Sequence, residues 1–227
     1  MLNTKKPAPS TSSHTDTTIE VAGGMEASVR MYGSKKRGEV SPLVVHFHGG
    51  AFVTGGLDNG CTVGHALAAA GACVVSVAYP LAPEHPFPRP LELGYAVLQW
   101  AHQQRARLAG KGAPLYLAGV CMMARDQLHP PLAGQILISP MLDPCAATPS
   151  QRAAQGESVT CKWASGWCQY LGGSHDAEHP YAVPARAHRL AGLPPSLILV
   201  GGDDPMRDEA LGYAQRLEAA GLPVFQH

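Results

Sequence analysis

The sequence predicts an α/β fold in which helices cover both faces of a mostly parallel sheet. Short runs rich in Val, Ile and Leu alternate with helical segments along the chain, and such runs are typical of strands buried on both faces. The chain has 227 residues, of which 45% are hydrophobic and 15% charged. A chain of this length and composition can bury a sizeable core in one domain.

The expected strands and helices follow from these runs and from the turn residues between them. Residues 17–21 and 27–32 alternate in polarity around Gly23-Gly24 and predict a hairpin. Further strands are expected at 43–47, 73–79, 115–118, 135–139 and 196–201, and helices at 61–70, 91–108 and 207–220.

The two remaining parts of the chain break this alternation. Residues 1–17 are rich in Ser, Thr and Pro and are expected to be a disordered tail, so that the domain spans residues 18–227. Residues 145–195 fit a cap inserted over a site. This segment holds Trp163, Trp167 and Tyr170 at helical spacing, which fits the packing of a core helix equally well.

Charge and composition exclude several partners. With 17 basic and 17 acidic residues the formal net charge is zero, which gives no electrostatic reason to expect nucleic acid or an anionic membrane. No apolar run is long enough to span a membrane, and no signal-peptide core follows Lys5 and Lys6. Six cysteines without CxxC spacing indicate free thiols in a cytoplasmic protein, and we expect neither a metal nor another cofactor.

The end of the strand at 43–47 carries the first chemical motif. There the chain reads His46-Phe47-His48-Gly49-Gly50-Ala51. Glycines allow backbone N–H groups to turn toward a developing oxyanion, which donors held in place stabilise strongly. The motif resembles the His-Gly-Gly-Gly motif of lipases and esterases, and this resemblance implies that Gly49, Gly50 and Ala51 form an oxyanion hole, with an ordinary glycine-rich turn as the alternative.

Four motifs in order resemble one known family. The chain adds Ala78–Pro88, Gly134–Pro140 and Asp204–Glu209 to the first motif, and over residues 18–226 it resembles the hormone-sensitive-lipase-like carboxylesterases of the α/β-hydrolase fold. The resemblance implies hydrolysis of a small acyl ester without a cofactor. It also implies that Asp204 is the acid of a catalytic triad, which orients a histidine. Capping of the helix that begins near Met206 is compatible with that role.

The chain departs from this family where the nucleophile belongs. The family continues its central strand as Gly-x-Ser-x-Gly, whereas here Gly119 is followed by Val120-Cys121-Met122-Met123. Cys121 stands at the nucleophile position, and a thiol activated by a base could act there. Met123 replaces the second glycine, however, which favours an unreactive buried thiol. Only ten residues separate Gly119 from Pro130, so we expect a shortened helix there.

The sequence also shows no recognisable triad base. His46 and His48 belong to the glycine-rich motif, and His227 stands where the last strand is expected to begin. We therefore predict a carboxylic-ester hydrolase by family whose activity is impaired or absent, because nucleophile and base act as a unit. The alternative is a catalytically inactive protein that binds a small acyl ester or another apolar small molecule. We also expect exposed apolar surface and an unpaired sheet edge, while the sequence leaves the oligomeric state open.

Overall fold

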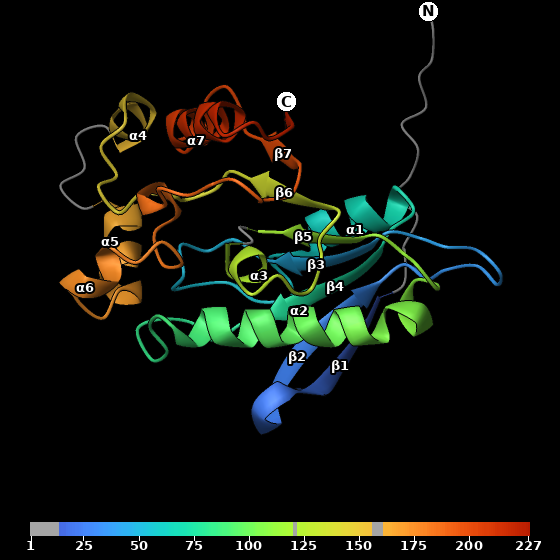
Figure 1. Ribbon diagram of the computed structural model, residues 1–227. Helices are drawn as coiled ribbons and strands as arrows, with labels where there is room; N and C mark the ends of the chain where they lie inside the picture. Colours follow the sequence, from blue (N-terminus) through green and yellow to red (C-terminus); the bar gives the residue numbers. More distant parts are fainter. Residues whose placement is uncertain (1–13, 120–121, 156–160) are drawn as a thin grey trace, which may run out of the picture.

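A computed structural model describes residues 14–119, 122–155 and 161–227 (Figure 1). Its centre is an eight-stranded sheet in the order β1-β2-β4-β3-β5-β6-β7-β8. Strand β2 runs antiparallel to both of its neighbours, and all pairs from β4 to β8 are parallel. The predicted fold class, an α/β fold with a mostly parallel sheet, is confirmed. The strands are β1 His14–Val21, β2 Met25–Tyr32, β3 Leu43–Phe47, β4 Cys73–Ala78, β5 Leu115–Ala118, β6 Gly134–Ile138, β7 Ser196–Leu199 and β8 Val224–Gln226.

The helices connect these strands and cover the sheet. Helix α1 packs against β2 and β4, and α2 packs against β3 and β4 (Figure 1). Helix α7 packs against β8 and α4. The α-helices are α1 Cys61–Ala69, α2 Arg89–Leu108, α3 Met122–Asp126, α4 Pro149–Gln155, α5 Lys162–Tyr170, α6 Ser174–Ala177 and α7 Arg207–Ala219, and short 3-10 turns occupy Ala22–Gly24 and Pro184–Arg186.

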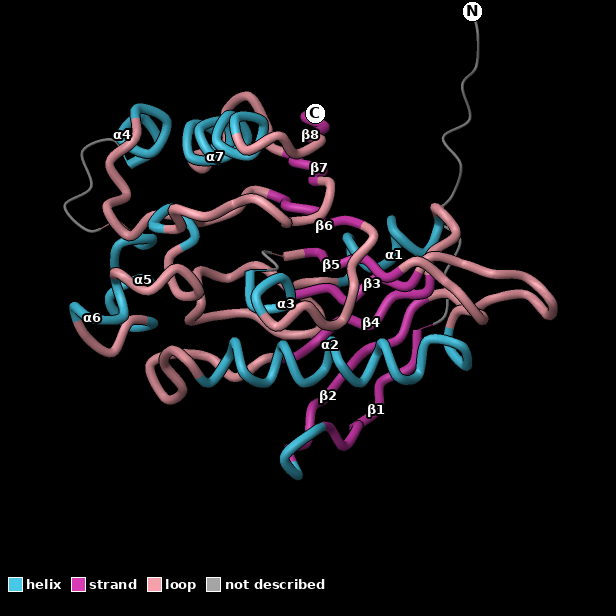
Figure 2. The backbone as a smooth tube through the Cα atoms, in the orientation of Figure 1, coloured by secondary structure: helices cyan, strands magenta, loops and turns pink. Residues whose placement is uncertain are grey.

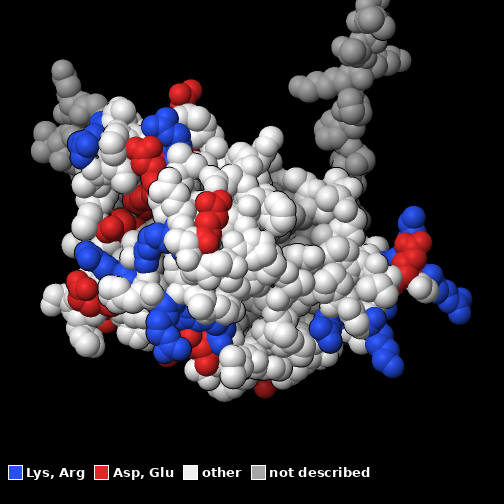
Figure 3. All heavy atoms as spheres, turned by 45° about the horizontal axis from the view of Figure 1, so that its top comes forward, with Lys and Arg blue, Asp and Glu red and all other residues white. Residues whose placement is uncertain are grey.

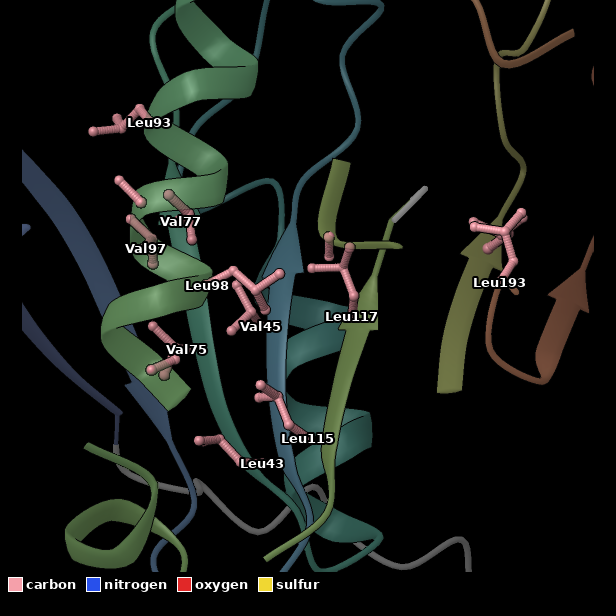
Figure 4. Close-up of a cluster of buried hydrophobic side chains, with 14 of the residues drawn as sticks. Leu43, Val45, Val75, Val77, Leu93, Val97, Leu98, Leu115, Leu117 and Leu193 are labelled. Atoms are coloured by element: carbon pink, nitrogen blue, oxygen red, sulfur yellow. The ribbon is translucent and has the colours of Figure 1, made fainter. Parts of the chain in front are cut away.

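Alternate residues of the parallel strands pack in two separate apolar layers. Leu43 and Val45 of β3 belong to the same buried cluster as Leu115 of β5 and Val97 of α2, and Figure 4 shows these side chains pointing toward one another. Val44, one residue out of phase, packs in a second cluster beside α1. Successive side chains of a strand point to opposite faces, so each strand contributes to both layers. This explains why the strands read as continuous apolar runs.

The first strand begins earlier than the boundary at residue 18 that composition suggested. His14 pairs with Tyr32, so β1 matches β2 along its whole length. Arg30 of β2 binds Asp16 through two N–H groups, at 2.6 and 2.7 Å, and this bidentate ion pair joins the two strands. The first residues of β1 are ordered by their partners in β2, and local composition does not reveal such partners.

Residues 145–195, the expected cap, contribute helices and turns but no strand among their described residues. Trp167 and Tyr170 of α5 are buried with Ala82, Ala182 and Val183 in a cluster of their own. These aromatics do pack as the core of a helix. Tyr170 also stacks on Phe52, which lies in the turn after β3, and Trp167 contacts the same ring at an interplanar angle of 58°, so α5 adjoins the glycine-rich motif.

Strands β1 and β8 lie at the two ends of the strand order of the sheet (Figure 2), and their side chains differ. Strand β1 presents mostly exposed polar residues, whereas Phe225 of β8 is 61% exposed. Ile138 at the end of β6 is 41% exposed. Exposed apolar side chains at the β8 side of the sheet agree with the expectation drawn from the sequence.

Candidate functional site

A cavity of about 460 Å³ opens at the carboxyl ends of β3, β5 and β6, and we call it the strand-end pocket. Ligands of open α/β sheets bind at this edge. The pocket is lined by the turn 46–52, the strand ends 117–119 and 136–141, and the aromatic residues Tyr79, Tyr95, Trp167, Tyr170 and Tyr181, with further apolar residues from α2 and the 182–184 segment. Its volume is within the range typical of small-molecule sites.

The turn after β3 is fixed by its backbone. Gly50 has φ +143°, and a Cβ atom at this position would lie 1.8 Å from Thr54 O, so only glycine fits. The N–H groups of Val53 and Thr54 donate to Gly50 O at 3.1 and 3.0 Å. Tyr79 Oη donates to His48 O at 2.8 Å from the neighbouring strand. The turn is therefore held at both its start and its end.

This turn leaves two donors unused. Gly49, Gly50 and Ala51 all line the strand-end pocket. Within the described residues, no acceptor is bonded to the N–H of Gly50 or of Ala51. Ala51 adopts φ +51°, so it takes the left-handed conformation that a third glycine would favour. The predicted oxyanion-hole residues thus lie together on the pocket wall.

Two histidines support the turn from beneath. His48 stacks on Tyr79 with 4.3 Å between ring centroids, and its Nδ1 lies 2.9 Å from Gly49 O. His46 Nδ1 lies 2.9 Å from Ser76 Oγ. Burial lowers the pKa of His46 to about 4 and also lowers the pKa of His48. Both rings are consequently neutral at pH 7.

Asp204 follows β7, and its two carboxylate oxygens have different partners. Oδ2 accepts a hydrogen bond of 2.5 Å from Ser139 Oγ, and Oδ1 accepts one of 2.7 Å from Met206 N. The second contact is a local one, and it does not cap the helix, because α7 has Met206 as its N-cap and no side-chain capping bond. No histidine of the described residues is among these partners. Asp204 therefore lies at the correct edge of the sheet, but it orients a serine rather than an imidazole.

Ser139 was not singled out from the sequence, although it lies within the quoted motif Gly134–Pro140. It follows β6 directly, lines the strand-end pocket and adopts φ +44°. A non-glycine residue in this conformation is uncommon and often marks a functional site. The contact with Asp204 joins residues 65 positions apart in the chain, so no local pattern announces it.

A second residue missed from the sequence is Glu209 of α7. Its Oε2 accepts hydrogen bonds from Leu142 N at 2.7 Å and Asp143 N at 3.2 Å, and its Oε1 accepts one from Gln151 Nε2. Burial raises the pKa of this carboxyl. Glu209 thereby anchors the segment that follows Ser139 to the helix that follows Asp204.

The position of the expected nucleophile is only partly visible. Gly119 ends β5 at the pocket wall, and α3 resumes at Met122 and ends at Asp126, which confirms the expected short helix. Cys121 lies outside the described residues. His227 pairs through its backbone with β7, donating from its N–H to Ile198 O at 3.0 Å. It is thus an extended residue beside β7.

The pocket carries little charge of its own. None of the described residues that line it is Lys, Arg, Asp or Glu. On the face in Figure 3, acidic and basic residues are interspersed around an uncharged centre. The described parts of the chain contain no cluster of three or more residues suited to a metal and no helix long and apolar enough to cross a membrane, and their five cysteines are free.

A mostly parallel sheet with a glycine-rich turn after β3 and an acidic residue after β7 defines the α/β-hydrolase class. A family model described as alpha/beta hydrolase fold matches residues 44–227, and the chain belongs to this family.

Known relatives agree with this assignment. Over 202 residues the chain is 38% identical to esterase LipI of Mycobacterium tuberculosis, covering 82% of this chain and 63% of LipI. It is 32% identical to the gibberellin receptor GID1C of Arabidopsis thaliana over 209 residues, covering 82% of this chain and 60% of the receptor. The crystal structure of esterase LipW from Mycobacterium marinum superposes with a TM-score of 0.79 at 33% identity, covering 95% of this chain and 71% of LipW. The chain thus spans less than two thirds of the length of LipI and of GID1C.

Proposed function

We propose that this chain binds a small acyl ester in the strand-end pocket and hydrolyses it slowly or not at all. The observation that carries the proposal is the turn after β3, where the N–H groups of Gly50 and Ala51 have no acceptor among the described residues and line an apolar cavity. Paired backbone donors of this kind bind the carbonyl oxygen of an ester and the oxyanion derived from it. The similarity to carboxylesterases such as LipI supports the ligand class.

Slow hydrolysis follows from the rest of the site. Residues 119–123 read Gly-Val-Cys-Met-Met, so no serine follows the central strand. The carboxylate of Asp204 is bonded to Ser139 and Met206. A hydroxyl at its ordinary pKa is a weak nucleophile without an adjacent base, and loss of either member of the pair removes most of the rate. The relatives include a gibberellin receptor, so receptor proteins occur among chains similar to this one.

The first prediction tests hydrolysis. The purified chain should hydrolyse p-nitrophenyl butyrate no faster than a double variant that carries Cys121→Ala and Asp204→Asn. A spectrophotometric assay of released p-nitrophenol compares the two proteins. A clear loss of rate in the double variant would contradict slow hydrolysis and would identify Cys121 or Asp204 as part of a working site. The single variants then separate the two residues.

Binding is tested with a matched pair of ligands. Ethyl hexanoate presents a carbonyl to the turn, whereas ethyl hexyl ether has a similar shape without one. Since each hydrogen bond contributes roughly 0.5–1.5 kcal/mol, calorimetric titration should show the ester binding about 5-fold tighter or more. Equal affinities would show that the turn does not bind the ester carbonyl. If neither ligand binds, the proposal is contradicted.

A further inference from the structure

Four of the five hydroxyl groups that line the strand-end pocket give their hydrogen to the protein, and the fifth belongs to Tyr170. A hydroxyl has one hydrogen and two lone pairs, so a hydroxyl that donates within the protein offers a ligand lone pairs only. The donors and their acceptors are Ser139 to Asp204 Oδ2 at 2.5 Å, Tyr79 to His48 O at 2.8 Å, Tyr95 to His129 O at 2.6 Å, and Tyr181 to Asp126 Oδ2 at 2.9 Å.

His48 follows the same rule. Its Nδ1 lies 2.9 Å from Gly49 O, and because a carbonyl oxygen only accepts, Nδ1 carries the hydrogen. Nε2 is then an acceptor. This atom has no hydrogen-bond partner among the described residues, although the side chain is buried, with 4% of the residue exposed. A polar atom left in this state points to a missing donor.

The turn after β3 therefore presents donors from the backbone, whereas the four bonded hydroxyl groups and His48 Nε2 present acceptors. The turn after β3 offers the N–H groups of Gly50 and Ala51, and the opposite strand end offers Ser139 Oγ. Ser139 cannot reverse its role while Asp204 is a carboxylate, because a carboxylate only accepts. A ligand that satisfies both sides must bring one acceptor and one donor.

The charge of the pocket restricts this ligand further. No Lys or Arg is among its described lining residues, and the carboxylate of Asp204 lies directly behind Ser139. An anion in this apolar space would lose its hydration without gaining a counter-ion. A neutral ligand therefore fits this lining better than an anion does.

From these observations we propose that the pocket selects a neutral ester that carries a hydroxyl group on its acyl chain. The ester carbonyl accepts from the N–H groups of Gly50 and Ala51, and the acyl-chain hydroxyl donates to Ser139 Oγ. The positioning residue Asp204 fixes the hydrogen of Ser139 away from the ligand. This inference rests on the proposed function, because it specifies the ester that the pocket binds.

The experiment compares uncharged esters with the same apolar body. Ethyl 3-hydroxyhexanoate and ethyl 5-hydroxyhexanoate carry the hydroxyl at two distances from the carbonyl, while ethyl hexanoate and ethyl 3-oxohexanoate lack a donor. Calorimetric titration should show at least one hydroxy ester binding about 5-fold tighter than ethyl hexanoate, the effect of one hydrogen bond. The oxo ester should gain nothing, and the 3-hydroxyhexanoate anion should bind at least about 10-fold more weakly than its ester.

Two variants examine the role of Ser139. Ser139→Ala should abolish the preference for the hydroxy ester over ethyl hexanoate. Asp204→Asn introduces an amide that donates to Ser139, which frees the Ser139 hydrogen to face the pocket, so the oxo ester should gain relative to the hydroxy ester. Ser174→Ala, at an exposed serine outside the pocket, is the matched control and should keep the wild-type order.

The outcomes separate this inference from the proposed function. Binding of ethyl hexanoate without any gain from either hydroxyl would overturn the inference and leave the proposed function intact. Failure of every ester to bind would overturn both. Should thermal unfolding show that Ser139→Ala is misfolded, the ligand series on the wild-type protein still decides. An unchanged order in Asp204→Asn would exclude the role given to Asp204.

Discussion

The two walls of the strand-end pocket offer complementary chemistry by different means. The wall after β3 uses backbone N–H groups held by glycine geometry, with Gly50 packed against Thr54 O. The wall after β6 and β7 uses side chains, with Ser139 bonded to Asp204. A wall made of backbone tolerates exchange of side chains, as Ala51 in place of a third glycine illustrates. A wall made of side chains depends on the identity of each residue and on the contacts that hold it.

The largest effect is expected where the side-chain wall is anchored. Glu209→Ala leaves the N–H groups of Leu142 and Asp143 and the amide of Gln151 without their acceptor, and each unsatisfied buried group costs roughly 1–3 kcal/mol. We expect the free energy of unfolding to fall by about 3 kcal/mol in urea titrations. Glu218→Ala, at an exposed position of the same helix, should change it by less than about 0.5 kcal/mol. A loss below about 1 kcal/mol in Glu209→Ala would show that this anchor is dispensable.

The second largest effect is expected at acid pH, which should lower the free energy of unfolding through a group beneath the wall after β3. His46 beneath the turn has its pKa lowered to about 4 by burial, and an unfolded histidine titrates near 6.5. Between these values the unfolded chain binds a proton that the folded chain does not, so stability is complete above the unfolded pKa and falls as the pH drops toward 4. The expected slope is on the order of 1 kcal/mol per pH unit, measured by urea unfolding at a series of pH values.

A substitution isolates the contribution of His46 from that of other groups. His46→Asn keeps a polar atom near Ser76 but does not titrate, so its stability should depend less steeply on pH across this window. His175→Asn, at an exposed histidine in α6, should leave the slope unchanged. Parallel profiles for His46→Asn and the wild type would show that another group causes the acid sensitivity.

The smallest effect is expected from Ala51→Gly in the wall after β3. This substitution retains the N–H and removes the conformational cost of an alanine in the left-handed region, about 1 kcal/mol. Glycine also raises the conformational entropy of the unfolded chain, which opposes folding by a similar free energy. Stability should therefore change by less than about 0.5 kcal/mol, and the affinity for ethyl hexanoate should stay within about two-fold. Ala51→Val provides the contrast, because a β-branched residue at this φ is strained and should destabilise measurably. A large loss of ester binding in Ala51→Gly would mean that the alanine methyl group contributes to the site.

The sequence predicted the strands well because each is an apolar run ended by a turn residue. The bounds of β3 and β5 agree with the expectation, and α2 and α7 lie where helices were expected. The glycine-rich turn was also identified locally, since its donors are consecutive in the chain. Glu209 and the pair Ser139–Asp204 could not be predicted in the same way. Their partners are 58 or more positions away in the chain, and the pairing of β6 with β7 brings the segments that carry them together.

The contrast between the sheet edges has a consequence for how the protein behaves in solution. Strand β1 carries Asp16 and Glu20, and charges on an edge strand oppose the addition of further strands. Strand β8 reads Val-Phe-Gln, and its phenylalanine is largely exposed. An added strand is therefore opposed at the β1 edge, whereas the exposed phenylalanine of β8 offers an extended segment an apolar side chain to cover.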